Sequence, residues 1–257
     1  MTRNRFEAGA ERYARFRPSY PPELAAHLAE AARRSVAASG SADDAELCAL
    51  DVGCGTGQLT RGLAEHFTRV IGADPSADQL SRATAHPRIT YVRAPAEALP
   101  AADASVHLVA AAQAAHWFDL DAFYSEVRRV AAPHAVLALV SYGVIETPPE
   151  FAPMFDRFYT EGIGPFWPPE RRHVDAGYAT LAFPFPELPM SDLAIVRDLA
   201  LDDFLGYVST WTAVHAAAEA GRDDVFAAFA ADLRALWGDP ARRHTFRWPL
   251  RGRLGRV

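Results

Sequence analysis

Residues 51–57 of the chain, with the sequence DVGCGTG, have the composition of a ligand-binding loop. They end a continuous apolar run and precede an amphipathic stretch, which indicates a strand that turns into a helix. Gly53, Gly55 and Gly57 at this turn let the backbone bend tightly and let a ligand approach it more closely than a Cβ would permit. The pattern predicts a turn whose backbone a ligand can approach closely.

The spacing of these glycines narrows the choice of ligand. A dinucleotide fingerprint has the order G-x-G-x-x-G, whereas here the third glycine comes one residue early and Gln58 stands in its place. The chain contains no lysine, which excludes the Walker lysine of a P-loop and any lysine Schiff base. An NAD-dependent oxidoreductase is therefore a disfavoured alternative.

Asp74 is a second candidate for ligand binding. It ends the apolar run 69–74, one predicted strand after the glycine loop. In doubly wound folds an acidic residue at such a position accepts hydrogen bonds from the two ribose hydroxyls of a nucleotide. The alternative role, a favourable charge at the start of the next helix, needs no ligand. The glycine loop one strand earlier favours the ribose interpretation.

The elements that would position these residues follow an alternating pattern. Between residue 47 and about residue 142, short apolar runs alternate with helical patterns, as in successive β-α units of a mostly parallel sheet covered on both faces. The five predicted strands are 47–52, 69–74, 89–93, 106–112 and 135–140. Further elements are predicted as a helix that starts at the proline pair 21–22, a strand at 192–199, helices at 202–220 and 223–238, and a last strand at 243–249.

Together these motifs resemble the class I S-adenosylmethionine-dependent methyltransferases, in particular the type 11 small-molecule set. LDVGCGTGQLT is similar to their first motif and IGADPSADQL to their second. Residues 94–120 are similar to the segment of the third and fourth strands, and 123–142 to the segment that leads into the fifth. RFRPSYPPEL near the start and AHWFD after the fourth strand are most similar to the trans-aconitate methyltransferase-like branch.

The resemblance implies an α/β fold, a Rossmann-like doubly wound sheet of seven strands, mostly parallel, with an antiparallel last strand and a helical lid insertion. It implies one methyltransferase domain over 1–257. Within it we expect an N-terminal helical cover (1–40), a cofactor-binding core (47–142), a lid or substrate segment (146–190) rich in proline and aromatic residues, and a C-terminal completion of the sheet (191–257). Phe151 and Phe155, four residues apart, are predicted to belong to a core.

The resemblance also implies S-adenosyl-L-methionine as cofactor. Asp51 would hold its methionine amino group and Asp74 its ribose, while Tyr13 could face the sulfonium and Arg17 a carboxylate unless they pack on a helix surface. The expected cofactor-binding residues are Tyr13, Arg17, Asp51, Gly53, Cys54, Gly55, Thr56, Gly57, Asp74, Pro75, Ser76, Gln79, Ala96, Glu97, Gln113 and Ala114.

His116 is the candidate catalytic residue. It follows the fourth predicted strand, where ligands bind in open α/β sheets, and could act as a general base with a pKa near 6.5 if the acceptor is a hydroxyl. Packing against the following helix is the alternative for His116, and packing is favoured for Trp117. Methyl transfer from a sulfonium needs no electrophile from the protein, so a carboxylate or amine acceptor would need little activation.

Composition excludes several partners. The 257 residues carry a net charge of -6, so no overall basic field exists to bind nucleic acid. No apolar run approaches the roughly 18 to 20 residues that span a bilayer, and the charged first residues lack the apolar core of a signal peptide. The two cysteines, Cys48 and Cys54, and the scattered histidines lack metal-site spacing. We expect a cytoplasmic enzyme with a small-molecule substrate and no catalytic metal, the alternative being a non-catalytic S-adenosylmethionine-binding module.

Overall fold

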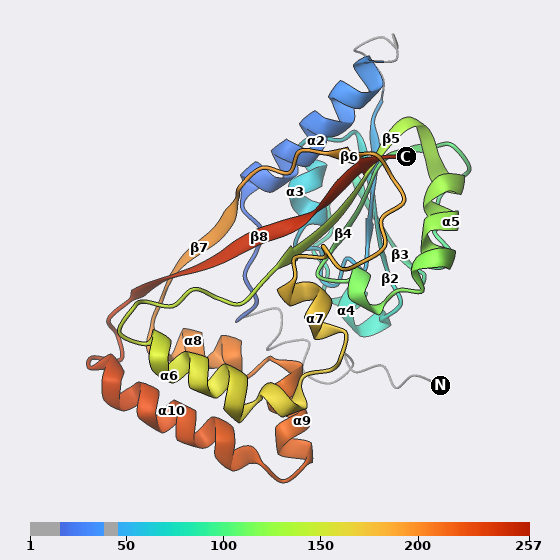
Figure 1. The fold of residues 1–257 in the computed structure, drawn as a ribbon. Helices are drawn as coiled ribbons and strands as arrows, with labels where there is room; N and C mark the ends of the chain where they lie inside the picture. The colour runs from blue at the N-terminus through green and yellow to red at the C-terminus, as the bar shows by residue number, and fades with distance from the viewer. Residues whose placement is uncertain (1–15, 39–45) are drawn as a thin grey trace.

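The computed structural model describes residues 16–38 and 46–257, and its centre is a mixed eight-stranded sheet in the order β3-β2-β1-β4-β5-β8-β6, with β7 paired to β8 (Figure 1). The strands are β1 (Cys48–Val52), β2 (Arg69–Asp74), β3 (Ile89–Arg93), β4 (Val106–Ala112), β5 (Ala131–Tyr142), β6 (Glu187–Leu188), β7 (Ala194–Leu199) and β8 (His244–Arg256). The first five are parallel and β8 runs antiparallel to β5, as expected. The sheet has eight strands rather than seven because two residues of the proline-rich segment form β6.

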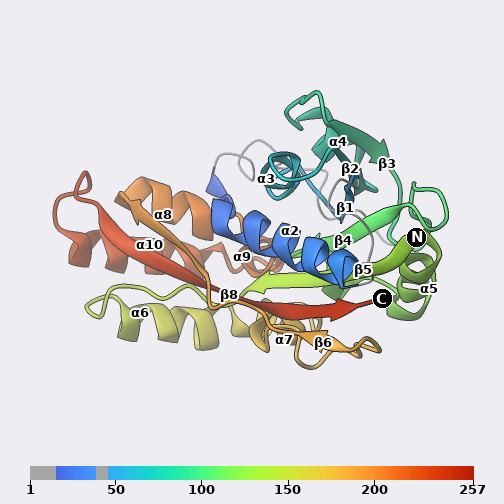
Figure 2. The same cartoon turned by 90° about the horizontal axis from the view of Figure 1, so that it is seen from above.

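Helices cover both faces of the parallel strands (Figure 2). On one face α2 (Pro22–Ala37) and α3 (Thr60–Ala64) bury alternate residues of β1, β4 and β5; on the other face α5 (Leu120–Val130) buries the intervening ones. The short helix α4 (Ala77–Ser81) begins at Ser76, whose hydroxyl accepts a hydrogen bond from the Gln79 amide at 3.3 Å. This layering places the ends of β1 and β2 beside short turns that are open to a ligand.

Strand β8 joins the sheet to a separate layer of helices. Its second half pairs with β5, whereas residues 244–249 pair with β7 beyond the end of β5. The layer that packs there contains α6 (Ala152–Arg157), η2 (Phe158–Gly162), η3 (Gly164–Phe166), α8 (Leu201–Val208), α9 (Thr212–Glu219) and α10 (Asp223–Trp237). Figure 1 shows it beyond the carboxyl ends of the parallel strands. The predicted helix 202–220 is divided here, because α8 and α9 are separate helices.

The segment 146–190 does not lie wholly over that edge. From the end of α7 (Arg171–Asp175) onward, buried residues between 174 and 185 pack on the face that α5 covers. Strand β6 pairs with Leu254 and Gly255 of β8, which pair in turn with the middle of β5. The segment thus runs from the helical layer along this face to the β8 side of the sheet. The part after Val174 therefore contributes to the core, and a lid role of the segment stays a prediction.

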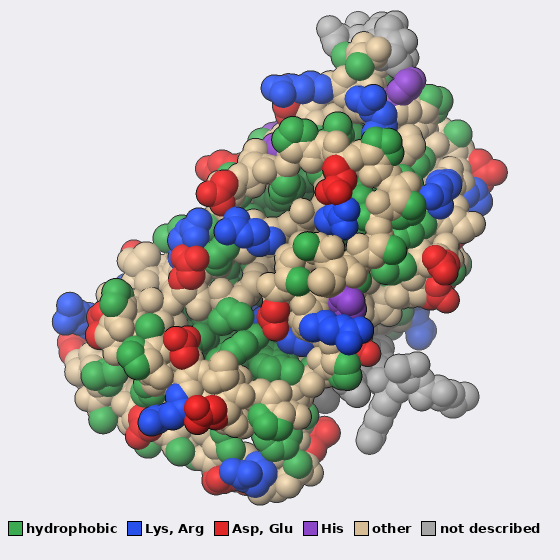
Figure 3. All heavy atoms as spheres, in the orientation of Figure 1, with side chains coloured by type: hydrophobic (Ala, Val, Ile, Leu, Met, Phe, Trp, Pro, Cys, Tyr) green, Lys and Arg blue, Asp and Glu red, His purple; other side chains and the backbone are tan. Residues whose placement is uncertain are grey.

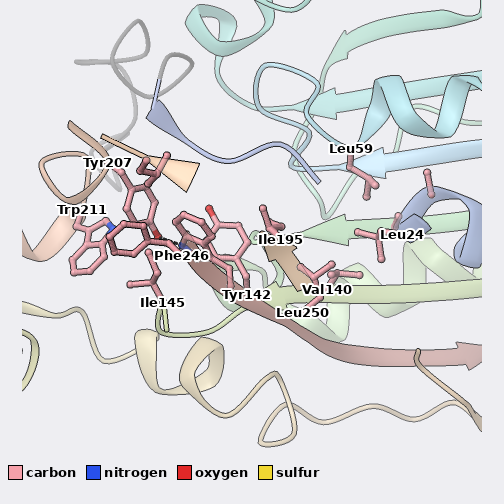
Figure 4. Packing of buried hydrophobic residues seen from close by; sticks show 14 of the residues in the cluster. Leu24, Leu59, Val140, Tyr142, Ile145, Ile195, Tyr207, Trp211, Phe246 and Leu250 are labelled. Carbon is pink, nitrogen blue, oxygen red and sulfur yellow. Dashed lines mark hydrogen bonds between the residues drawn. The ribbon is translucent and has the colours of Figure 1, made fainter. Parts of the chain in front are cut away.

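Aromatic side chains make up the core of the helical layer. Phe151 and Phe155 are 1% and 2% exposed, which confirms that both are core residues. Phe158 stacks on Phe229 of α10 with ring centroids 3.9 Å apart. The close view in Figure 4 shows this core continuing toward the sheet through Tyr207 and Tyr142. None of the helices that the structure describes is long and apolar enough to cross a membrane.

Candidate active site

A cavity of about 920 Å³, its open mouth included, lies at the carboxyl ends of β1, β2 and β4. This is where parallel α/β sheets bind ligands. The cavity is lined by Arg17, Pro18, Tyr20, Asp51, Gly53, Cys54, Gly55, Gln58, Leu59, Asp74, Pro75, Ser76, Gln79, Ala112, Gln113, Ala114, Trp117, Phe118 and Tyr142.

The glycine loop after β1 forms one wall of this cavity. Gly53 and Gly55 have φ angles of +70° and +58°, which other residues adopt at a cost. A Cβ on Gly53 would lie 2.5 Å from the Cβ of Ala114. The Gly53 and Cys54 amides donate to the Ala73 carbonyl at 2.7 and 3.0 Å, which ties the loop to the end of β2. The chain can therefore turn here because position 53 has a positive φ angle and no room for a Cβ.

Asp74 is fixed by the backbone around it. Its two carboxylate oxygens accept hydrogen bonds from the amides of Gly55 and Ser76 at 2.9 and 2.8 Å. Burial raises the pKa of this carboxyl, and the two amide donors oppose that rise. Each carboxylate oxygen can accept more than one hydrogen bond, so the residue remains able to bind a ligand's hydroxyl groups.

Asp51 lies deeper in the same cavity. The Thr60 hydroxyl donates to its Oδ2 at 2.6 Å, while Oδ1 is buried without a hydrogen-bond partner among the described residues. Burial raises the pKa of Asp51 to about 7, and the nearby charge of Asp74 adds to the rise. A buried carboxylate with an unfilled acceptor is costly in the free protein, and a cationic ligand group would offset that cost.

Two glutamines complete the polar lining. The side-chain oxygen of Gln79 is buried and has no donor within the part of the chain that the structure describes. Gln113 follows β4 with a φ of +56°, and its side-chain amide donates to the Tyr142 carbonyl at 2.8 Å. Backbone held in this region by surrounding contacts is common at functional sites.

Comparisons with known proteins identify the family. Residues 50–139 match the methyltransferase domain family. A Dictyostelium discoideum protein named as a methyltransferase is 31% identical over 225 residues, which is 86% of this chain and 82% of that one. A solved structure from Anaeromyxobacter dehalogenans, named as a type II methyltransferase, is 47% identical with a TM-score of 0.83, covering 94% of this chain and 98% of that one. The chain belongs to the class I S-adenosylmethionine-dependent methyltransferases.

Another relative matches over a shorter stretch. An uncharacterized methyltransferase of Mycobacterium tuberculosis is 38% identical over 136 residues, which is 52% of this chain and 51% of that one. None of these relatives is named for trans-aconitate, so that branch stays a prediction.

The cavity of this methyltransferase fits S-adenosylmethionine. The buried acceptors on Asp51 and Gln79 lack partners among the described residues, and Asp74 sits one strand away from Asp51. The glycines leave room that a Cβ would fill. A cationic amino acid joined to an adenosine would supply donors for these groups.

Of the residues expected to bind the cofactor, four described ones lie outside the cavity lining. Thr56, Gly57, Ala96 and Glu97 do not line the cavity, and neither does the candidate base His116. The Glu97 carboxylate accepts instead from the Asp119 amide at 3.0 Å. A Cβ on Gly57 would lie 2.3 Å from the Tyr91 hydroxyl oxygen, so this glycine serves packing. Tyr13 lies outside the described residues.

The surroundings of His116 do not favour a base that titrates near neutral pH. Its Nδ1 lies 3.0 Å from the Tyr178 hydroxyl, behind the cavity wall. Burial lowers the pKa of His116 to about 3, and the charges of Arg171 and His173 add to that effect. A pKa this low disfavours the expected titration near 6.5, because the imidazole then binds a proton too weakly to act as an efficient base. The role of His116 as a base stays a prediction.

The sequence reasoning missed several lining residues and their connection to the helical layer. Arg17 donates from Nε to the Thr210 hydroxyl and from Nη1 to the Tyr142 hydroxyl, both at 3.1 Å, so it links the cavity to α8 and α9. Trp117, expected to pack, lines the cavity and is 38% exposed. The lining residues that were not expected at all are Pro18, Gln58, Leu59, Ala112, Phe118 and Tyr142. Only the positions of Ala112 and Tyr142 at strand ends could have indicated them.

Proposed function

We propose that this enzyme binds S-adenosylmethionine in the cavity at the ends of β1 and β2 and transfers its methyl group to a small-molecule nucleophile. The observation that carries the proposal is the pair of buried carboxylates, Asp51 and Asp74, held on adjacent strands in one cavity with acceptor capacity left. When bound, the cofactor supplies a methyl group on a positively charged sulfur, so the protein need not activate the leaving group.

The residues divide this work between them. Asp51 would accept a hydrogen bond from the ammonium group, and Asp74, already oriented by the Gly55 and Ser76 amides, would accept from the ribose hydroxyls. Tyr20, Tyr142 and the other aromatic lining residues would exclude water from the reacting groups. What remains for the protein is placement of the acceptor in line with the methyl group.

The first experiment tests the cofactor site. Asp74→Ala should weaken binding of S-adenosylhomocysteine about 10- to 100-fold, because the ribose loses charge-assisted hydrogen bonds. Titration calorimetry at fixed salt measures this. Asp121→Ala, which removes an exposed carboxylate at the start of α5, is the matched control and should bind like the unmodified protein. Equal affinity of all three proteins would refute the proposed site.

The two alternative functions predict different experimental results. A non-catalytic binding module would bind the cofactor tightly but release no S-adenosylhomocysteine when supplied with a mixture of small metabolites. An NAD-dependent oxidoreductase would change the fluorescence of NADH on mixing. Cofactor binding together with product release in the metabolite mixture supports methyl transfer.

A further inference from the structure

Arg171, at the start of α7, is a cation with unused hydrogen-bond donors. Its side chain is 19% exposed, and its Nε donates to Asp175 Oδ1 at 2.9 Å. The Tyr159 hydroxyl also lies within hydrogen-bonding reach of the guanidinium. The other Nη donors have no acceptor among the residues that the structure describes. The guanidinium instead lies over the ring of Trp167, with its carbon 4.6 Å from the ring centroid. A sparsely hydrated guanidinium with free donors is suited to a planar anion.

Trp167 supplies a second unused donor beside the first. Its indole Nε1 is buried and has no acceptor among the described residues. A buried N–H without an acceptor is rare in folded proteins, because its lost hydration is not replaced. Two adjacent residues therefore present donors that the protein itself does not satisfy.

This pair lies close to the cofactor cavity. Helix α7 packs against η1 (Ala115–Trp117), and Trp117 and the preceding Ala114 line that cavity. On the other side Trp167 contacts Trp211, with ring centroids 5.6 Å apart. Figure 3 shows this face of the molecule hollowed between the sheet and the helical layer, with hydrophobic side chains along the hollow.

A chain of ring contacts completes the connection to the cavity. Trp211 lies 5.5 Å from Tyr207, centroid to centroid, and the guanidinium carbon of the lining residue Arg17 lies 5.6 Å from the Tyr207 ring. Figure 4 shows Trp211, Tyr207 and Tyr142 in succession along this path. Arg171 and Arg17 thus contact the first and the last ring of one series of aromatic contacts.

The charges around the aromatic cluster favour a ligand of negative charge. Arg171 and Arg17 contribute two positive charges, while Asp175 contributes one carboxylate, which is also the acceptor of the Tyr159 hydroxyl at 3.2 Å. A cationic ligand would be repelled, and an uncharged one would leave the guanidinium donors unfilled. An organic anion with an apolar body matches both the charge and the aromatic walls.

We propose that Arg171 and Trp167 form a carboxylate-binding subsite that anchors the methyl acceptor, so that the enzyme acts on small organic acids. This proposal rests on the proposed methyl transfer, because it assigns the acceptor of that same reaction. Arg171 would hold the carboxylate through the Nη donors that Tyr159 does not occupy, and Trp167 would donate from Nε1.

Binding of a simple probe tests the subsite. Phenylacetate and its uncharged isostere phenylacetamide are titrated into protein saturated with S-adenosylhomocysteine, with tryptophan fluorescence and saturation-transfer NMR as readouts. Phenylacetate should bind about 10- to 100-fold more tightly than the amide, because only the anion forms charge-assisted hydrogen bonds with Arg171. Arg171→Gln should remove that preference.

Two further variants separate the subsite from general effects. Arg172→Gln removes an equal charge from an exposed neighbour on the same helix and should keep the preference. Trp167→Phe keeps most of the aromatic wall without the donor and should weaken phenylacetate several-fold more than phenylacetamide. In all variants the affinity for S-adenosylhomocysteine should stay unchanged, which also shows that each protein is folded.

Three results would overturn the proposal: no saturable phenylacetate binding at high millimolar concentration, equal binding of acid and amide, or an equal loss in Arg171→Gln and Arg172→Gln. Failure of the unmodified protein to bind S-adenosylhomocysteine is a separate result, which would refute the proposed function itself.

Discussion

The cofactor side and the proposed acceptor side of this enzyme are built in different ways. The cofactor side comes from consecutive β-α units, and backbone groups shape it: positive φ angles at Gly53 and Gly55 and amide donors to Asp74. The acceptor side is assembled from distant segments, since Arg17 contacts Thr210 and Tyr142. Its walls are large side chains rather than main chain.

This difference has a physical consequence. A site formed by backbone and tight turns tolerates little substitution, because a single added carbon meets fixed neighbours. A site formed by aromatic side chains on separate helices can change its shape through single substitutions while the sheet stays intact. Related enzymes could therefore share a cofactor and differ in acceptor, and the substrate is harder to infer than the cofactor.

The largest expected effect of a substitution is a loss of stability on the cofactor side, at Gly53. Gly53→Ala should lower the free energy of unfolding by about 2 to 4 kcal/mol, since the residue must hold a φ of +70° and its Cβ would lie 2.5 Å from that of Ala114. Urea unfolding measures the loss. Gly143→Ala is the control because no atom lies within 4 Å of its added Cβ. If the two variants were equally stable, the glycine loop would tolerate a side chain, and the cofactor side would be no more constrained than the acceptor side.

The same contrast explains what the sequence could predict. Gly53, Asp51 and Asp74 were found because each stands at the end of a strand whose apolar pattern is local, so their meeting follows from the order of strands. Tyr142 and Pro18 were missed because their contact with the cavity depends on how remote segments pack. The surroundings of His116 could not be predicted for a related reason: nothing near it in sequence reveals that the Tyr178 hydroxyl lies 3.0 Å from its ring.

The next effect concerns the protonation of Asp51. Its pKa of about 7 in the free protein means that the carboxyl is mostly protonated at lower pH. If it accepts from the ligand's ammonium group, the bound state favours the carboxylate, so binding releases a proton. Affinity for S-adenosylhomocysteine should then rise about tenfold per pH unit from pH 5 toward 7 and level off above it.

Calorimetry in buffers of different ionisation enthalpy counts the released proton directly. Asp51→Asn should bind more weakly and lose most of the pH dependence. A dependence that persisted in Asp51→Asn would assign the proton to Asp74, whose pKa burial also raises, and would contradict this role for Asp51.

The smallest effect is expected at His116, behind the cavity wall. The pKa of His116 in the folded protein is about 3, below the usual value of 6.5. Between these two pH values the unfolded chain binds a proton at this residue and the folded chain does not. The stability that neutral His116 contributes is complete above pH 6.5 and decreases as the pH falls toward 3. Between pH 6.5 and 5.5 the unmodified protein should lose roughly 1 kcal/mol more of its unfolding free energy than His116→Asn.

Comparing the two proteins cancels the contributions of the other histidines, and urea unfolding at the two pH values gives the difference. His116→Asn should also leave the affinity for S-adenosylhomocysteine unchanged, because the ring does not line the cavity. An imidazole signal of His116 that titrates near pH 6.5 by NMR would contradict its burial against Tyr178. That result would restore His116 as a candidate base, and the acceptor side would then contain a titrating group as well as binding groups.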